Sequence, residues 1–230
     1  MKIGAMTDKG RIREQNEDAY GYKDHLFVIA DGMGGHEAGE IASAIAVETI
    51  LASEISPDLA GSLQAAVKKA NNAILAEINQ NETLDGMGTT VAVLWLDTDR
   101  AYVAHVGDSR IYQFHGGDLI QLTADHSLVA ELVKNGSITE EEAKIHPQRN
   151  VLTRALGTKG ELDLEINLFQ VHQGDKFLLC SDGLTGMLDE AAIRNLMALP
   201  EDPQAIAGLM VAKANENGGS DNITVIVIEV

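Results

Sequence analysis

Cysteine is nearly absent from this chain: its 230 residues include only one, Cys180. A single thiol cannot form an internal disulfide, and it excludes a zinc site built from several cysteines. Cys180 ends the apolar run Phe177-Leu178-Leu179, where a buried structural thiol is more common than a nucleophile. Any metal that the chain holds is therefore expected to have ligands other than sulfur.

Positive charge is also scarce, because 17 lysines and arginines stand against 35 aspartates and glutamates, for a net charge of −18. Binding to nucleic acid or to an anionic membrane surface needs a basic footprint, so we expect neither kind of partner. A solvated acidic surface accounts for most of the excess charge. Carboxylates still outnumber their possible cationic partners, which leaves some of them to be neutralised by metal ions.

Long apolar runs are missing as well. No segment approaches the ~20 apolar residues that cross a bilayer. The N-terminal sequence MKIGAMTDKG lacks the apolar region of a signal peptide. No linker rich in proline or serine and no fixed-period repeat divides the chain. We therefore expect a single cytoplasmic domain over residues 1–230, in a chain of ordinary apolar content (45%).

Apolar periodicity predicts strands and helices in groups rather than in strict alternation. Strands are predicted at 2–6, 25–30, 89–96, 100–106, 110–115, 118–122, 162–169, 176–180 and 222–229, with a polar stretch from the first strand to residue 22. Helices are predicted at about 38–53, 59–79, 127–135, 189–198 and 203–215, and a further one starts at Thr139 with the spacing of a capping box. This grouping favours an α+β fold with antiparallel sheets over an alternating βαβ fold.

The segment IADGMGGHEAGE, residues 29–40, joins an apolar strand to a helix through glycines. Such a loop can cradle a nucleotide phosphate with backbone amides, can hold a metal, or can be only a tight turn. Asp31 opposes the first interpretation, because a carboxylate repels phosphate unless a cation lies between them. A nucleotide-binding ATPase or kinase would also need a lysine and a hydroxyl residue directly after Gly34-Gly35, and neither follows.

Four aspartates share one local setting, at the end of an apolar strand with a glycine close by: Asp31, Asp108, Asp182 and Asp221. Any one of them alone is more often a turn residue than a ligand. If the four converge, their charges repel strongly unless divalent cations neutralise them. Oxygen ligands select Mg²⁺ or Mn²⁺ over zinc. The residues themselves therefore favour a di-metal carboxylate site and leave its substrate open.

Short blocks spread along the whole chain carry a family resemblance. They are Thr7-Asp8-Lys9-Gly10, Arg13-Glu14-Gln15-Asn16-Glu17-Asp18, Asp31-Gly32-Met33-Gly34-Gly35, Gly88-Thr89-Thr90, His105-Val106-Gly107-Asp108-Ser109-Arg110, Leu152-Thr153-Arg154-Ala155-Leu156-Gly157, Ser181-Asp182-Gly183-Leu184 and Gly219-Ser220-Asp221-Asn222-Ile223-Thr224. Each block is weak by itself, but all of them occur in family order. In this respect the chain resembles the metal-dependent serine/threonine protein phosphatases (PPM, type 2C) in their bacterial single-domain form.

The resemblance implies a four-layer α/β sandwich, in which two central antiparallel sheets are flanked by pairs of helices. It also implies a ligand set for two Mn²⁺ or Mg²⁺ ions, with a weaker third. The implied ligands are Asp31 bridging the two ions, Asp182 and Asp221 on the first, the carbonyl of Gly32 on the second, Glu17 and Asp18 acting through waters, and Asp108 with Asp182 at the third site. A flap over the active site is implied at about 128–154.

The chemistry that the resemblance implies is hydrolysis of phosphoserine and phosphothreonine by a metal-activated water that attacks phosphorus directly. Arg13, four residues before Glu17-Asp18, matches the arginine of the family that pairs with phosphate. Some relatives carry a histidine directly after the aspartate-glycine pair, where this chain has Met33. His36 is then the nearest candidate for the acid that protonates the leaving oxygen, and a metal-bound water is the alternative.

The expected partners are phosphorylated proteins, including a Ser/Thr kinase and its substrates, and the expected assembly is a monomer. A catalytically weak regulator that binds phosphoproteins on the same fold is the alternative function. A missing metal ligand would favour that alternative, but Asp31, Asp182 and Asp221 are all present.

Overall fold

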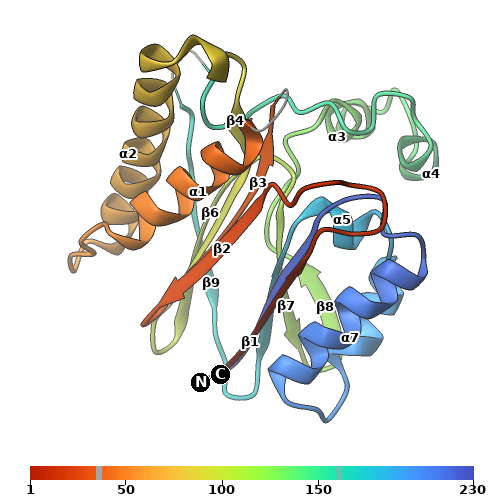
Figure 1. The fold of residues 1–230 in the computed structure, drawn as a ribbon. Coiled ribbons are helices and arrows are strands. Elements are labelled where there is room, and N and C mark those ends of the chain that lie inside the picture. Colours follow the sequence, from red (N-terminus) through yellow and green to blue (C-terminus); the bar gives the residue numbers. More distant parts are fainter. Residues whose placement is uncertain (35–37, 159, 161) are drawn as a thin grey trace.

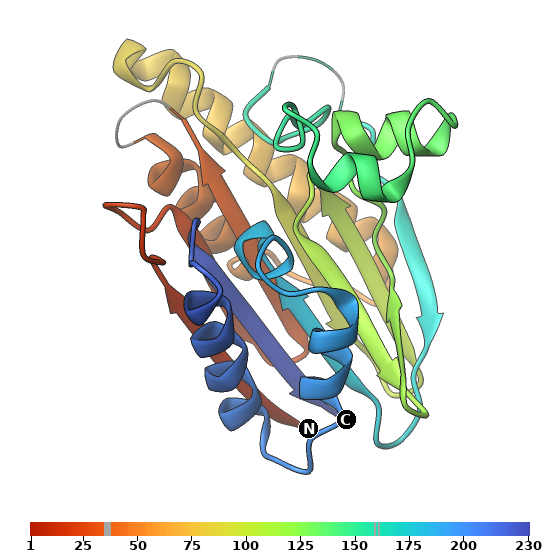
Figure 2. The ribbon, with the colours of Figure 1, turned by 90° about the vertical axis from the view of Figure 1, so that its right-hand side faces the viewer.

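Two antiparallel β-sheets lie face to face between two groups of helices (Figures 1 and 2) in the computed structural model, which describes residues 1–34, 38–158, 160 and 162–230. The first sheet has the order β1-β11-β10-β7-β8. Its strands are β1 (Lys2–Asp8), β11 (Ile223–Glu229), β10 (Lys176–Cys180), β7 (Arg110–His115) and β8 (Asp118–Gln121). Because β1 pairs with β11, the first and last strands of the described chain lie side by side.

The second sheet has the order β2-β3-β5-β6-β9. Its strands are β2 (Asp18–Lys23), β3 (Leu26–Met33), β5 (Val91–Leu96), β6 (Arg100–Val106) and β9 (Ile166–Gln170). A two-residue strand, β4 (Gly88–Thr89), pairs with the end of β3. Strand β9 leads into β10, so the 171–175 link carries the chain from one sheet to the other.

The two sheets bury a shared apolar core between their inner faces. Phe27 and Leu94 of the second sheet belong to the same buried cluster as Phe177 and Ile226 of the first. Side chains alternate along each strand, so the next residues in sequence, such as Val28 and Leu178, face the outer helices instead. Strands buried on both faces read as continuous apolar runs, which is why their positions were visible in the sequence.

Helices cover the outer face of each sheet. On the second sheet lie α1 (Ala38–Leu51) and α2 (Leu59–Gln80), and the short 3-10 helix η1 (Glu82–Leu84) follows α2. On the first sheet lie α5 (Asp182–Thr185), α6 (Glu190–Met197) and α7 (Pro203–Glu216). The order helices, sheet, sheet, helices confirms the α+β fold with antiparallel sheets that the apolar pattern predicted and the four-layer sandwich that the family resemblance implied.

Two short helices, α3 (Leu128–Lys134) and α4 (Glu140–Lys144), project from one end of the sandwich (Figure 1). Neither helix contains a buried residue. The capping box expected at Thr139 is present, since Thr139 and Glu142 each bond the other's backbone amide.

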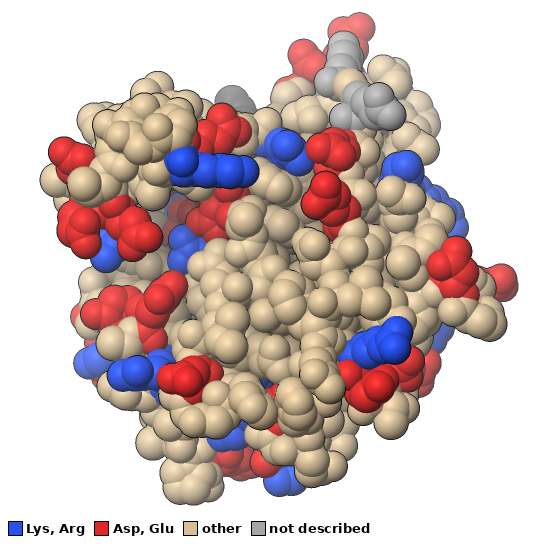
Figure 3. Space-filling view, turned by 180° about the vertical axis from the view of Figure 1, so that it is seen from behind, with Lys and Arg blue, Asp and Glu red and all other residues tan. Residues whose placement is uncertain are grey.

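The face seen from behind (Figure 3) shows acidic and basic side chains scattered around a central area that carries neither.

Three local predictions need correction. The polar stretch before residue 22 contains β2, an edge strand that the pairing with β3 defines although its own sequence has no apolar run. The strand predicted at 162–169 is shorter, Ile166–Gln170, because Leu162 and Leu164 pack against the α1–α2 core without pairing. The four-residue helix α5 was not predicted. In the part of the chain that is described, no helix has the length and apolar content to cross a membrane.

Candidate metal centre

Four strand ends meet at the end of the sandwich that carries α3. Asp31 lies near the end of β3, Asp108 in the turn from β6 to β7, Asp182 directly after Ser181 at the end of β10, and Asp221 just before β11. All four line one cavity of about 390 Å³, together with Arg13, Glu17 and Gly32. A further carboxylate, Asp18, lies opposite Asp31 in the register of β2 and β3. The structure thus brings the predicted aspartates together.

Burial and mutual repulsion raise the pKa of these carboxyl groups. Burial raises the pKa of Asp31 well above its usual range, and the neighbouring charges of Asp18 and Asp182 add to the effect. Burial likewise raises the pKa of Asp182 to about 6 and the pKa of Asp18 to about 7. For Asp108 burial and then the charge of Asp182 raise the pKa to about 7. Such a cluster is unfavourable in its charged form without cations.

Unsatisfied oxygens show that the site fits divalent cations. Oδ1 of Asp18 and Oδ1 of Asp182 are buried and have no hydrogen-bond partner in the described structure. Buried polar atoms normally have a hydrogen-bond partner, so two unpaired carboxylate oxygens in one cluster indicate that the cluster binds cations. Carboxylate oxygens are the donors that Mg²⁺ and Mn²⁺ prefer. The negative charge of the cluster, its oxygen ligands and its two unpaired oxygens all favour binding of a divalent cation such as Mg²⁺ or Mn²⁺.

Arg13 reaches into this cavity from the loop that joins β1 to β2. Its Nη2 donates to Oδ2 of Asp221 at 2.8 Å, and about half of its side chain is exposed. The same guanidinium lies among the charges of Glu17 and Asp31, which help to raise its pKa although burial acts in the opposite sense. Arg13 is thus a cation at the mouth of an acidic cavity, in a position to meet an anion.

Asn222 fixes the loop that carries Arg13. Its Nδ2 donates to the carbonyl of Lys9 at 3.0 Å and to that of Gln15 at 2.8 Å, and its Oδ1 accepts from the amide of Glu17 at 2.8 Å. One side chain thereby closes both ends of a nine-residue loop against the start of β11. In the sequence Asn222 stands only as the residue after Asp221, and its local pattern predicts no role for it.

Threonines hold the backbone of Asp31. The hydroxyl of Thr90 accepts from the amide of Asp31 at 2.9 Å, and the hydroxyl of Thr89 donates to its carbonyl at 2.9 Å. Thr90 also shares a 2.6 Å hydrogen bond with the buried hydroxyl of Ser109, next to Asp108. These residues tie the ends of β3, β4 and β7 together, so the carboxylates of Asp31 and Asp108 are held on a rigid frame.

Ser181 performs the same task between the two sheets. Its hydroxyl donates to Oδ2 of Asp18 at 2.7 Å and accepts from the amide of Thr224 at 3.0 Å. Asp18 belongs to β2 in one sheet, whereas Ser181 follows β10 in the other. This contact between sheets orients Asp18, and its only sequence signal was the place of Ser181 next to Asp182.

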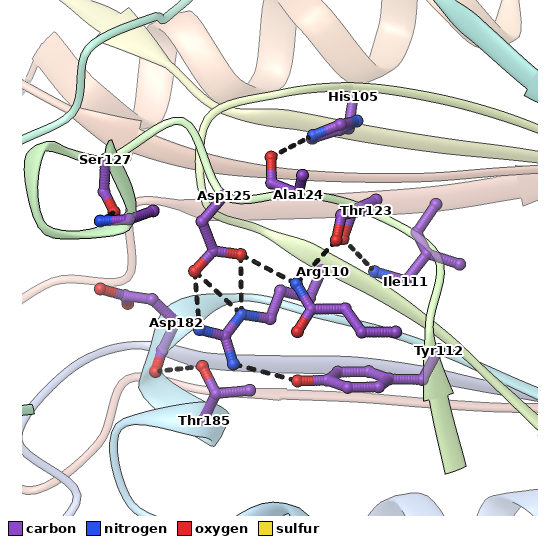
Figure 4. Close-up of polar contacts among 12 residues, drawn as sticks. His105, Arg110, Ile111, Tyr112, Thr123, Ala124, Asp125, Ser127, Asp182 and Thr185 are labelled. Atoms are coloured by element: carbon purple, nitrogen blue, oxygen red, sulfur yellow. Dashed lines mark hydrogen bonds and ion pairs between the residues drawn. The ribbon is translucent and has the colours of Figure 1, made fainter. Parts of the chain in front are cut away.

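A partly buried ion pair between Arg110 and Asp125 lies near Asp182 (Figure 4). Arg110 donates through Nε and Nη2 to both carboxylate oxygens of Asp125, the shortest contact being 2.6 Å, and through Nη1 to the hydroxyl of Tyr112. The bond fastens the segment after β8 to the start of β7, two residues from Asp108. Asp125 belongs to none of the family blocks, so the sequence carries no local signal for this partner.

Close backbone approach explains why glycine occupies position 32. A Cβ added to Gly32 would lie 2.1 Å from the carbonyl oxygen of Gly39 and 2.6 Å from that of Glu17. The absence of a side chain lets the start of α1 pack directly on β3 beside the cavity. Gly183 is similar, since a Cβ there would lie 2.0 Å from the carbonyl oxygen of Asn222.

The candidate acid His36 lies outside the described residues, so its prediction is not tested. Met33, which stands where some relatives carry histidine, lines the cavity. Another imidazole, that of His126, accepts from the amide of Gly107 at 3.2 Å and stacks on His105 with ring centroids 4.5 Å apart. Burial lowers the pKa of His126 to about 4, so this residue is neutral near pH 7.

Comparison with known proteins gives consistent results. The family model described as protein phosphatase 2C matches residues 11–205. The serine/threonine phosphatase stp of Listeria innocua is 38% identical over 97% of this chain and 93% of its own length. The crystal structure of the Mycobacterium tuberculosis serine/threonine phosphatase PstP/Ppp superposes with a TM-score of 0.94 at 38% identity, covering 100% of this chain and 99% of that one.

A second solved structure bears on the metal. It is the catalytic domain of the serine/threonine protein phosphatase PstP in complex with two manganese ions. It superposes with a TM-score of 0.91 at 36% identity, covering 98% of this chain and 96% of that one.

Proposed function

This chain belongs to the protein phosphatase 2C family, and from that membership and the acidic cavity we propose how it hydrolyses phosphoserine and phosphothreonine in proteins. As a member of this family the chain is a phosphoprotein hydrolase of the serine/threonine type. The observation that carries the detailed proposal is the cluster of Asp18, Asp31, Asp108, Asp182 and Asp221 around one cavity, in which two buried carboxylate oxygens have no hydrogen-bond partner among the described residues.

We assign the cluster to two divalent cations, with Mn²⁺ or Mg²⁺ as the candidates. Asp31 would bridge them, Asp182 and Asp221 would complete the first, and the Gly32 carbonyl would bind the second. Glu17 and Asp18 would act through waters, and Asp108 with Asp182 would hold a weaker third ion. Bound there, the cations would neutralise the carboxylates and acidify a water for attack on phosphorus. The relative with two manganese ions supports this number and kind of ion.

Arg13 would orient the substrate phosphate. A planar guanidinium can donate two parallel hydrogen bonds to phosphate oxygens, which an ammonium cannot reproduce. In this structure the guanidinium donates to Asp221, so it lies next to the proposed cations, where a phosphate bound to them would be within its reach. The attack breaks the bond from phosphorus to the serine or threonine oxygen, and that oxygen then needs a proton, for which His36 remains the candidate.

The shape of the surface suits a protein substrate. The 390 Å³ cavity has room for a phosphorylated side chain, and it shares Arg13, Glu17 and Gly34 with a wider hollow of about 900 Å³ that extends to Asn81, Thr83 and Leu84. A segment of polypeptide on either side of the phosphorylated residue could lie in that hollow. We further infer that residues 1–230 act as one catalytic unit with a flap at about 128–154, that the chain acts in the cytoplasm as a monomer, and that a Ser/Thr kinase and its substrates are among its partners.

The assignment is tested with Asp182→Asn and Asp221→Asn, which keep side-chain size but remove a charge. Each variant should lose Mn²⁺-dependent hydrolysis of p-nitrophenyl phosphate and of a phosphothreonine peptide, and should bind Mn²⁺ more weakly in calorimetry. Asp99→Asn, in the exposed turn between β5 and β6, is the matched control and should behave as wild type. Full activity in either cavity variant would disprove the metal assignment, whereas peptide binding without turnover in the wild type would favour the regulatory alternative.

A further inference from the structure

Three side chains that serve no part of the phosphatase site converge at the opposite end of the sheets. His115 ends β7, and His172 and Asp175 lie in the link from β9 to β10. One ligand atom from each lies within 4.8 Å of the others. Strand β10 runs from just after Asp175 to just before Ser181, so the cluster lies roughly 20 Å from Asp182 at the spacing of an extended strand.

The carboxylate of Asp175 is buried and held in one orientation. Its side chain is 2% exposed, and its Oδ2 accepts from Nε2 of Gln113 at 2.7 Å and from the amide of His172 at 2.9 Å. Gln113 is itself fixed by a bond to the carbonyl of Gln170 at 2.9 Å. Two donors thus hold one carboxylate oxygen, and the other, Oδ1, faces the imidazole of His115 at 2.6 Å.

The two imidazoles lie over this carboxylate and remain open to solvent. Each side chain is 49% exposed, and the ring centroids are 4.6 Å apart. Nδ1 of His172 lies 3.6 Å from Oδ2 of Asp175, which is too far for a good hydrogen bond. Two adjacent imidazole rings beside one fixed carboxylate offer nitrogen and oxygen ligand atoms on a face that an ion can reach.

We propose that His115, His172 and Asp175 form a second metal site, for a borderline transition ion of which Zn²⁺ is the representative. Two imidazoles and one carboxylate suit Zn²⁺, whereas the all-oxygen cavity suits Mg²⁺ or Mn²⁺. Bonds of about 2.0 Å to a tetrahedral ion place ligand atoms about 3.3 Å apart. The present ligand atoms lie on both sides of that spacing, from 2.6 Å between His115 and Asp175 to no more than 4.8 Å. Rotation of the exposed rings would adjust these distances on binding, and solvent would complete the fourth position.

The ion would hold together the end of β7 and the link from β9 to β10, and it would take no part in hydrolysis. The amide of Val230 donates to the carbonyl of Asp175 at 3.0 Å, and the amide of Gly174 donates to the carbonyl of Val230 at 3.2 Å. The link between the two sheets, the end of β7 and the end of the chain therefore meet at this cluster. Zn²⁺ bound there stabilises the junction and leaves the aspartate cavity unchanged.

Zinc binding by the full chain tests the proposal. Isothermal titration with ZnCl₂ is carried out in saturating Mg²⁺, so that the oxygen site is occupied, and is repeated with the double variant His115→Gln/His172→Gln. Wild type should bind one more Zn²⁺ than the double variant. The single variant His172→Gln should bind that ion at least tenfold more weakly, since even the partners of metal ligands change affinity by about 10–100-fold. Zn²⁺ should also raise the melting temperature of wild type more than that of the double variant.

His25→Gln is the matched control, because His25 is an exposed histidine that contacts Trp95 and is not one of the three residues of the cluster. It should bind Zn²⁺ as wild type does. All variants should retain Mg²⁺-dependent phosphatase activity, which separates this proposal from that for the oxygen site. Equal Zn²⁺ stoichiometry and affinity in wild type and in folded His172→Gln would overturn the second site. The half-exposed position of the His172 ring makes loss of folding in that single variant unexpected.

Discussion

Each aspartate of the cavity lowers the stability of the fold, because its carboxylate is partly or fully removed from water and lies beside other negative charges. Asp31 is half-buried among like charges, and the buried oxygens of Asp18 and Asp182 lack partners in the described structure. A fold that only needed stability would place apolar residues there. Residues with perturbed pKa values that gather in a cavity mark functional sites, and here the chemistry of their oxygens indicates what they bind.

Arg13 is the residue whose substitution should separate substrate binding from catalysis. Arg13→Ala should raise KM for p-nitrophenyl phosphate by about 10–100-fold, because hydrogen bonds to charged groups contribute about 1.5–3 kcal/mol and a factor of ten is about 1.4 kcal/mol. A smaller change in kcat is expected if the contact exists already with bound substrate. Steady-state kinetics at saturating Mn²⁺ measure both constants.

Two further variants sharpen that experiment. Arg13→Lys should recover only part of the affinity, since lysine cannot form the bidentate contact. Arg11→Ala, on the same loop but not lining the cavity, should have a KM close to that of wild type. An unchanged KM in Arg13→Ala would show that Arg13 does not bind phosphate.

Among the elements, the loop from Lys9 to Glu17 depends most on contacts far away in sequence. It has no regular secondary structure, yet it presents both Arg13 and Glu17 to the cavity. Its shape is fixed by Asn222, a residue that is 4% exposed and whose three side-chain hydrogen bonds all go to this loop.

Asn222→Ala should therefore lower both stability and activity. Three lost hydrogen bonds of about 0.5–1.5 kcal/mol each predict a decrease of about 2–4 kcal/mol in the free energy of unfolding, measurable by urea denaturation. The remaining folded enzyme should show a raised KM, because Arg13 is no longer held in place. Asn217→Ala is the control: Asn217 is exposed and donates one side-chain bond, to the carbonyl of Met187, so it should lose about 1 kcal/mol and keep its KM.

Most elements could be predicted from the sequence, and the failures have a common cause. Strands β6, β7 and β10 have the predicted bounds, because β6 and β10 are largely apolar runs buried by their neighbours and β7 lies between the turn at Gly107 and the glycine turn after His115. Strand β2 was missed because only its pairing with β3 makes it a strand. The segment 162–165 was predicted to be part of a strand because Leu162 and Leu164 alternate with acidic residues. In the structure both leucines pack against the core without pairing to another strand. The pattern of apolar residues along one segment shows which residues are buried, whereas strand pairing depends on a second segment far away in the sequence.

At the scale of the whole molecule, the cavity links stability to pH and to metal. Burial raises the pKa values of Asp182, Asp18 and Asp108 to about 6–7 from an unfolded value near 3.8. Between about pH 4 and 7 the folded chain then binds more protons than the unfolded chain, so stability falls as pH rises in that window. In EDTA the melting temperature should decrease from pH 5 to pH 8, by about 2–4 °C for each kcal/mol lost.

Metal should reverse this trend, since saturating Mn²⁺ binds the ionised carboxylates and favours the folded state. Asp31→Asn supplies the contrast. With one charge removed, its melting temperature in EDTA at pH 8 should exceed that of wild type, and Mn²⁺ should stabilise it much less. Calorimetric melting across the pH range tests both statements, and a metal-free wild type that becomes more stable towards pH 8 would contradict them.

The sequence by itself determined the composition of the site and the class of the fold. Aspartates after apolar runs, glycines beside them and grouped strands and helices are local features, and they were sufficient to predict a carboxylate metal site in an α+β fold with antiparallel sheets, whereas the four-layer sandwich came from the family resemblance. The order of the blocks was sufficient to identify the family that the comparisons then showed.

Only the tertiary structure decided which side chains hold those aspartates in place. Asn222 closes a loop some 200 residues earlier in the chain, Ser181 joins the two sheets at Asp18, and Asp125 receives Arg110. The cluster of His115, His172 and Asp175 likewise exists only because the end of β7 meets the link from β9 to β10. The physical reason is the same in each case: strand order and sheet stacking set these distances, and neither is encoded by the spacing of residues along one segment.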